Sequence, residues 1–210
     1  MALKGTQIIA SEFRASGDRG FAAVNPVTGA LLEPRFRDAC YDEIDRAAKA
    51  AADSFDQYRK LPMAQRAIFL EDIGSELTAC APELVARAHI ETALPEARLE
   101  GELARTVNQL KLFARMVKKG SFVAARIDRA APERRPAPKP VIRTMLVPLG
   151  PVAVFGAGNF PLAFSVAGGD TASALAAGCS VGVKGHPAHP GTCALAGQAI
   201  VNAIRKNHSP

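Results

Sequence analysis

Two continuous apolar runs near the end of the sequence constrain the fold more than any other feature. Residues 151–155 read Pro-Val-Ala-Val-Phe and residues 179–184 read Cys-Ser-Val-Gly-Val-Lys, and a glycine follows each run. Neither run alternates between polar and apolar residues, which is typical of strands buried on both faces of a parallel sheet. The small residues of 165–177 predict a helix between the strands, and residues 192–206 predict a second helix. This order of elements predicts an α/β fold with a parallel sheet.

The first 120 residues are predicted to form a mainly helical scaffold. Apolar residues recur at helical spacing over residues 42–59 and again after Pro62, and Pro82 fits the first turn of a third, short helix. The longest helix is predicted for residues 95–118, because their apolar positions follow a regular series of three and four residues. Within this helix Glu102 and Arg105 are three residues apart, and we expect them to pair in solvent.

The composition changes after Gly120 in a way that predicts a protruding β-hairpin. Residues 122–127 and 141–147 are rich in strand-forming residues, whereas 128–140 contain four prolines among basic residues. Prolines cannot donate hydrogen bonds to a central ladder, so the segment is predicted to be two strands joined by an exposed loop. A basic loop of this kind is more often a solvated tip than a phosphate site.

Composition argues against several classes of protein. The chain has 210 residues, 48% of them hydrophobic and 22% charged, which fits one globular domain. Its net charge of +6 permits attraction to phosphates, but no Trp and two Tyr leave few platforms for base stacking. We therefore expect no nucleic-acid partner. No apolar run reaches membrane-spanning length, and four widely spaced cysteines are typical of reduced thiols, so a cytoplasmic location is expected.

The turn after the first apolar run is the strongest candidate for a ligand site. Residues 156–161 read Gly-Ala-Gly-Asn-Phe-Pro and satisfy the first half of the dinucleotide fingerprint, although Pro161 replaces its last glycine. Asn159 lies just past a strand end, where α/β proteins bind ligands. Its amide is suited to donate to an oxyanion or to cap the turn, and the sequence leaves both roles open.

The second strand end adds a cation. Lys184 is suited to contact a phosphate or a ribose. His186 and His189 follow on a proline-rich loop with no further ligand nearby, so no metal site is expected. Cys193 lies near a predicted helix N-terminus, which lowers a thiol pKa, but no base is assigned to it and a structural role is favoured.

Several segments together resemble the N-terminal part of the aldehyde dehydrogenase superfamily, in particular its branch of α-ketoglutaric semialdehyde and related NADP-dependent bacterial enzymes. The matching segments are Asn25–Gly29, Glu91–Leu99, Gly101–Leu110 and Pro148–Thr192. The last of these contains Asn-Phe-Pro-Leu-Ala-Phe, which begins at Asn159. The resemblance implies a partial Rossmann-like cofactor-binding domain over residues 1–210. Its parts would be the scaffold of 1–120, the hairpin of 122–147 and the cofactor-binding segment of 148–210.

The resemblance also implies roles for single residues. Asn159 matches the family's oxyanion-hole asparagine. Phe155, Gly156 and Ala157 match the backbone that lines the cofactor, and Lys184 matches the lysine on the adenosine ribose. Many members that prefer NAD have a glutamate where this chain has Pro187. Without that carboxylate, and with His186 near Lys184, NADP is expected to be accepted, with NAD as the alternative.

The family's reaction also needs parts that do not match this sequence. A cysteine thiolate attacks the aldehyde and a glutamate activates water, but none of Cys40, Cys80, Cys179 and Cys193 lies at the nucleophile's position. The 210 residues are therefore not expected to oxidise a small aldehyde alone. Two interpretations remain: a truncated dehydrogenase, with 122–147 as an oligomerisation arm, or a non-catalytic binding module or product of a broken gene.

Overall fold

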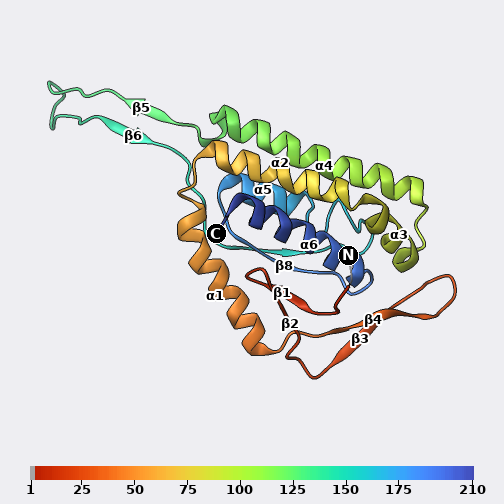
Figure 1. Cartoon of the computed structure of the whole chain (residues 1–210). Helices are drawn as coiled ribbons and strands as arrows, with labels where there is room; N and C mark the ends of the chain where they lie inside the picture. The colour runs from red at the N-terminus through yellow and green to blue at the C-terminus, as the bar shows by residue number, and fades with distance from the viewer. Residues whose placement is uncertain (1–2) are drawn as a thin grey trace.

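The computed structural model describes residues 3–210 and shows a mixed α/β arrangement (Figure 1). The strands are β1 (Gln7–Ile9), β2 (Glu12–Arg14), β3 (Gly20–Val24), β4 (Leu31–Arg37), β5 (Arg126–Asp128), β6 (Ile142–Thr144), β7 (Val152–Phe155) and β8 (Val181–Lys184). The helices are α1 (Tyr41–Tyr58), α2 (Met63–Ala79), α3 (Ala81–Thr92), α4 (Glu96–Lys119), α5 (Gly169–Ala177) and α6 (Pro190–Asn207), with a short 3-10 helix at Ser121–Val123. No helix in this part of the chain is both long enough and apolar enough to cross a membrane.

The helices of the first 120 residues form where apolar periodicity predicts them. Helices α2 to α6 share one hydrophobic core, and Figure 1 shows α2 and α4 stacked along its upper side. Leu70 and Ile73 of α2, Leu84 of α3, and Leu99 and Leu110 of α4 are all at most 1% exposed. Complete burial of a leucine or isoleucine side chain contributes about 1.5–3 kcal/mol. The burial of these side chains therefore stabilises the packing of the helices.

The parallel sheet is smaller than the sequence predicts. Strands β7 and β8 pair in parallel, with Val152 opposite Val181 and Phe155 opposite Lys184, and each pairs with no third strand among residues 3–210. The expected burial on both faces is wrong, because only Val154 of β7 is buried and Phe155 is 74% exposed. The predicted Rossmann-like sheet is thus a two-stranded parallel ribbon.

Two helix starts also differ from the prediction. Helix α5 begins at Gly169 instead of Ser165, because residues 158–168 form a compact turn segment. Its backbone forms hydrogen bonds within the segment and with the Glu102 side chain of α4. Helix α6 begins at Pro190, two residues earlier than predicted, because a proline suits the first helical turn. The predicted order of strand, helix, strand and helix is confirmed.

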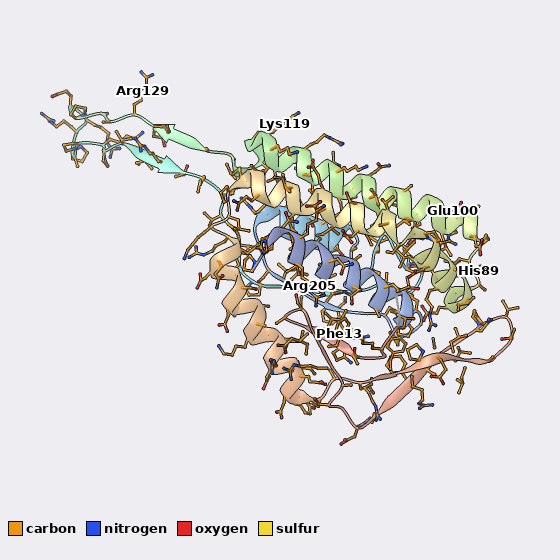
Figure 2. All side chains as sticks on the ribbon, in the orientation of Figure 1. Phe13, His89, Glu100, Lys119, Arg129 and Arg205 are labelled. Atoms are coloured by element: carbon orange, nitrogen blue, oxygen red, sulfur yellow. The ribbon has the colours of Figure 1, made fainter. Side chains whose placement is uncertain are left out.

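The predicted hairpin is present and projects away from the helices (Figure 1). Strands β5 and β6 pair antiparallel, with Arg126 opposite Thr144, and Arg129 lies on the projecting arm (Figure 2). Strand β5 begins at Arg126, later than predicted, because residues 121–123 form the 3-10 helix. On the returning side the segment from Met145 to Leu149 is not in a strand, and its large apolar side chains are exposed.

The remaining strands form two antiparallel hairpins close to the N-terminus, β1–β2 and β3–β4. The turn between β3 and β4 is stabilised by Asn25, whose Oδ1 accepts hydrogen bonds from the N–H groups of Val27 and Thr28. Gly29 completes the turn with a φ of +72°, a backbone region that favours glycine. The predicted pair of extended pieces around Asn25–Gly29 is confirmed.

Candidate functional site

The carboxyl ends of β7 and β8 bring the predicted site residues together. Phe155 and Lys184 are register partners, and the N–H of Gly156 donates to the carbonyl of Lys184 at 3.0 Å. Both side chains are exposed. The carboxyl end of the two strands therefore carries the Phe155 ring and the Lys184 ammonium group beside the glycine-containing turn of residues 156–161. Open α/β sheets bind ligands at this place.

Gly158, in the turn that follows β7, lies against the His186 ring. A Cβ atom on Gly158 would lie 2.8 Å from Cε1 of that ring, so only glycine allows this approach. The Nδ1 atom of His186 accepts a hydrogen bond from the N–H of Ala188, which leaves the proton of the neutral ring on Nε2. Partial burial lowers the pKa of His186, and the nearby His189 and Lys184 lower it further. Near pH 7 this side chain therefore offers an N–H donor instead of a positive charge.

His189 is the residue that sequence reasoning assessed only as a metal ligand. Its ring is fully buried, and Nε2 lies 2.9 Å from the carbonyl oxygen of Ala157. The ring also stacks on His186, with centroids 5.4 Å apart. His189 thus joins the turn after β7 to the loop after β8. Among residues 3–210 no three His, Cys, Asp or Glu side chains are gathered so that they could hold a metal ion together.

The structure gives Cys193 a neighbouring base that the sequence did not assign. Its Sγ lies 3.4 Å from Nδ1 of His189 and 3.4 Å from the hydroxyl oxygen of Ser165. In the neutral ring Nε2 donates to the Ala157 carbonyl and Nδ1 accepts from the thiol, whereas in the charged ring both nitrogens donate, Nδ1 to the sulfur. Burial lowers the pKa of His189, and the contacts with Cys193 and Ala157 more than offset it, so the pKa lies above its ordinary value. Because Cys193 is buried, we still assign it a structural role in packing.

Asn159 is exposed on the turn that follows β7. Its carbonyl oxygen accepts a hydrogen bond from Nη2 of Arg98 at 3.2 Å. Its side-chain amide makes no hydrogen bond with any residue from 3 to 210, so no contact supports the turn-capping alternative. The amide is free to donate to a ligand.

Glu102 corrects the expectation of a solvent-exposed pair with Arg105. The Glu102 side chain is buried, and its Oε1 accepts hydrogen bonds from the N–H groups of Leu162 (2.8 Å) and Ala163 (2.9 Å). Buried N–H groups without a hydrogen-bond partner are costly, whereas an exposed ion pair contributes little to stability. The Glu102 carboxylate therefore binds the backbone and not Arg105. Helix α4 therefore anchors the turn that carries Asn159.

Glu91 is a second buried carboxylate that the sequence did not single out. Its two oxygens accept hydrogen bonds from the N–H groups of Gly191 and Thr192 and from the Thr192 hydroxyl, each at 2.8 Å. Arg87 pairs with the same carboxylate at 2.9 Å. The positive end of the α6 dipole is thus neutralised from inside the protein, so it is not available to a phosphate.

The side chains at the ends of β7 and β8 are chemically suited to bind phosphate or hydroxyl oxygens. Gly156 and Gly158 allow tight packing within the protein, since a Cβ at Gly158 would lie 2.8 Å from the His186 ring and one at Gly156 would lie 3.4 Å from the Ser165 hydroxyl. Lys184 supplies a positive charge and His186 an N–H donor, both suited to phosphate or hydroxyl oxygens. Neither strand end holds a carboxylate that would repel a phosphate.

Comparison with known proteins agrees with the fold. The sequence profile of the aldehyde dehydrogenase family matches residues 13–205. The chain is 52% identical to α-ketoglutaric semialdehyde dehydrogenase 2 of Azospirillum brasilense, with alignment over 100% of this chain and 40% of that protein. It is 49% identical to α-ketoglutaric semialdehyde dehydrogenase of Acinetobacter baylyi, over 83% of this chain and 33% of that protein.

A solved structure shows the same arrangement of elements. HpcC from Thermus thermophilus superposes with a TM-score of 0.81 at 25% identity, over 95% of this chain and 37% of that protein. The chain thus spans about two fifths of the length of the relatives it matches.

Proposed function

The chain belongs to the aldehyde dehydrogenase family, and from that premise we propose that it supplies the oxyanion donor and the adenosine side of the cofactor cleft for the NADP-linked oxidation of a semialdehyde. The observation that carries the proposal is the free, exposed amide of Asn159 beside the joined ends of β7 and β8. We do not assign the nucleophilic thiol or the general base of the family's reaction to any of the 210 residues. The activity is therefore proposed for a chain of the relatives' length.

Each residue at the edge has a role in this proposal. The nicotinamide, when bound, accepts a hydride from the substrate. The amide of Asn159 donates a hydrogen bond to the oxyanion that forms when a thiolate adds to the aldehyde carbon. Lys184 and His186 hold the phosphorylated ribose, with NAD as the alternative cofactor. Phe155, Gly156 and Ala157 line the path between these two points.

The proposed substrate is α-ketoglutaric semialdehyde or a close analogue. Two relatives at 52% and 49% identity carry that activity in their names. The test joins residues 1–205 of this chain to the remaining part of the Azospirillum brasilense relative, which gives a fusion enzyme of family length. We expect NADP reduction with a semialdehyde by the fusion enzyme and none by the 210-residue chain. A folded fusion enzyme without aldehyde oxidation would contradict the proposed function.

A non-catalytic binding module is the second candidate. It is favoured by the exposed apolar side chains near β7, since Leu149 is 99% exposed and Met145, Leu146 and Val147 are each more than half exposed. Exposed apolar patches of this kind commonly mark contact surfaces. An inactive fusion enzyme, together with a monomeric 210-residue chain that unfolds cooperatively, would favour this second function.

Replacing Lys184 with alanine tests the cofactor site. In the fusion enzyme, Lys184→Ala is expected to raise KM for NADP about tenfold or more with little change in kcat at saturation, because it removes a charge–phosphate contact. KM for NAD, which lacks the 2′-phosphate, is expected to change less. The Kd for NADPH, measured by fluorescence, should rise in parallel. Lys111→Ala, at an exposed position of α4, is the matched control; an unchanged KM and Kd in Lys184→Ala would contradict the assignment.

Deleting the tip of the arm tests the proposed homo-oligomer. Removing residues 129–138 takes away the basic, proline-rich loop beyond β5 and β6 but leaves the helical core untouched. We expect the fusion enzyme to shift towards monomer in sedimentation velocity while its helical circular dichroism is kept. An oligomer of unchanged size would show that residues 122–147 are not the assembly arm.

A further inference from the structure

Two arginines of α4, Arg98 and Arg105, lie beside the turn that carries Asn159 and have no carboxylate partner among residues 3–210. We infer that Arg105, assisted by Arg98, recognises a carboxylate group carried by the aldehyde substrate and so determines specificity. The inference rests on the proposed function and adds to it the residues that select the substrate class. It follows from charge, aromatic contacts and the orientation of Glu102.

The charge on these two arginines is not compensated by an ion pair. Elsewhere the basic side chains of the chain often pair, as Arg59 does with Asp56 and Lys118 with Glu71. Arg98 and Arg105 form no ion pair with any residue from 3 to 210, although both are exposed. Arg98 contacts only the carbonyl of Asn159 and an aromatic ring, and Arg105 contacts only aromatic rings.

Glu102 lies between Arg98 and Arg105 in the sequence, but its carboxylate binds other groups. Glu102 is four residues after Arg98 and three before Arg105, which is the spacing of helical ion pairs. Its carboxylate is instead buried against the N–H groups of Leu162 and Ala163. Glu100 lies on a different side of α4 from Arg98, since residues two apart on a helix do not face each other. The face of α4 towards the turn is therefore left positive.

Two aromatic rings connect this positive face to the turn. Phe160 follows Asn159 directly and packs edge to face against Phe164, with centroids 5.2 Å apart. The Arg105 guanidinium lies 5.1 Å from the Phe164 centroid and 6.0 Å from that of Phe160, and Arg98 lies 5.5 Å from Phe160. Phe164 is 38% exposed. The surface thus runs from an amide donor, across an apolar wall, to two guanidinium groups.

This order matches an aldehyde that carries a carboxylate at its other end. The amide suits the reacting oxygen, the rings suit the carbon chain, and a guanidinium fork suits a carboxylate. An arginine held by stacking on aromatic rings loses less side-chain freedom when it forms that bond. For an uncharged aldehyde the two guanidinium groups would lose water without gaining a partner, which disfavours binding.

The test compares two aldehydes of equal length on the fusion enzyme. Succinic semialdehyde carries a carboxylate and butanal does not. Arg105→Met keeps the apolar stem and removes the charge, so kcat/KM for succinic semialdehyde is expected to fall about 10–100-fold, mainly through KM, as expected for loss of a charge-assisted contact. The value for butanal should change less than about threefold. Arg105→Lys should recover part of the loss, because it restores charge without the planar fork.

Arg115→Met is the matched control, since Arg115 is exposed on the same helix and forms no ion pair with residues 3–210. It should leave both aldehydes unaffected. An Arg105→Met variant that is impaired equally on both aldehydes, or on neither, would overturn the assignment while the proposed function stands. A wild-type fusion enzyme that oxidises neither aldehyde would overturn the proposed function and this assignment together.

Discussion

In the fusion enzyme, Asn159→Ala is expected to lower kcat by about two to three orders of magnitude, the usual effect of removing one oxyanion donor. The loss should appear in kcat with little change in KM for NADP, because the amide acts on charge that develops only in the transition state. Asn159 forms no side-chain hydrogen bond within residues 3–210, so its removal leaves no buried group without a partner. The measurement is steady-state kinetics with a saturating semialdehyde.

Asn108→Ala is the control for this prediction, because Asn108 is an exposed asparagine on α4 and forms no side-chain hydrogen bond with residues 3–210. It should keep both kcat and stability. A variant of Asn159 that loses its fold, or that keeps full turnover, would contradict the oxyanion role. The first of these results would restore the turn-capping alternative.

The largest effect on stability is expected at Glu91. Glu91→Leu leaves Arg87 and the first N–H groups of α6 without their buried partner, and breaking a buried pair from one side costs about 3–5 kcal/mol. Glu91→Gln keeps an oxygen acceptor but loses the charge, so it should cost less. Urea unfolding of the fusion enzyme, followed by circular dichroism, compares the stability of the variants. This is a direct test of the capping network.

Glu100→Leu serves as the control, since Glu100 lies exposed on α4 (Figure 2). Exposed substitutions usually change the free energy of unfolding by less than about 0.5 kcal/mol. If Glu91→Leu and Glu100→Leu were equally mild, the hydrogen bonds of Glu91 to α6 would not contribute to stability in solution.

The elements that the sequence predicts well are those with long local patterns. Helix α4 follows from the apolar series of residues 95–118, and the hairpin follows from the prolines between β5 and β6. In both, the information lies within one segment of sequence. The meeting of Phe155 and Lys184 was also predictable, because parallel strands bring their carboxyl ends to one edge.

The buried carboxylates could not be assigned in the same way, because their partners are far away in sequence. Glu102 binds backbone 60 residues later and Glu91 binds backbone 100 residues later. A signal was nevertheless present: Glu102 is three residues after Leu99, and Glu91 is three residues after Ala88, so each glutamate interrupts a buried apolar stripe. A charged residue at a core position indicates a buried polar partner. The burial of β7 was misjudged because an apolar run does not show which elements cover a strand, and among residues 3–210 β7 pairs only with β8.

The parallel ribbon of β7 and β8 has a consequence for association, because both of its edges are open among residues 3–210. Each strand pairs along one side only, so peptide N–H and C=O groups along both outer sides are available to any extended segment that meets them. Chaperones and proteases compete with self-association for such segments. Self-association of this part of the chain therefore depends on what covers the two edges of the ribbon, and the well-packed helical core does not protect them.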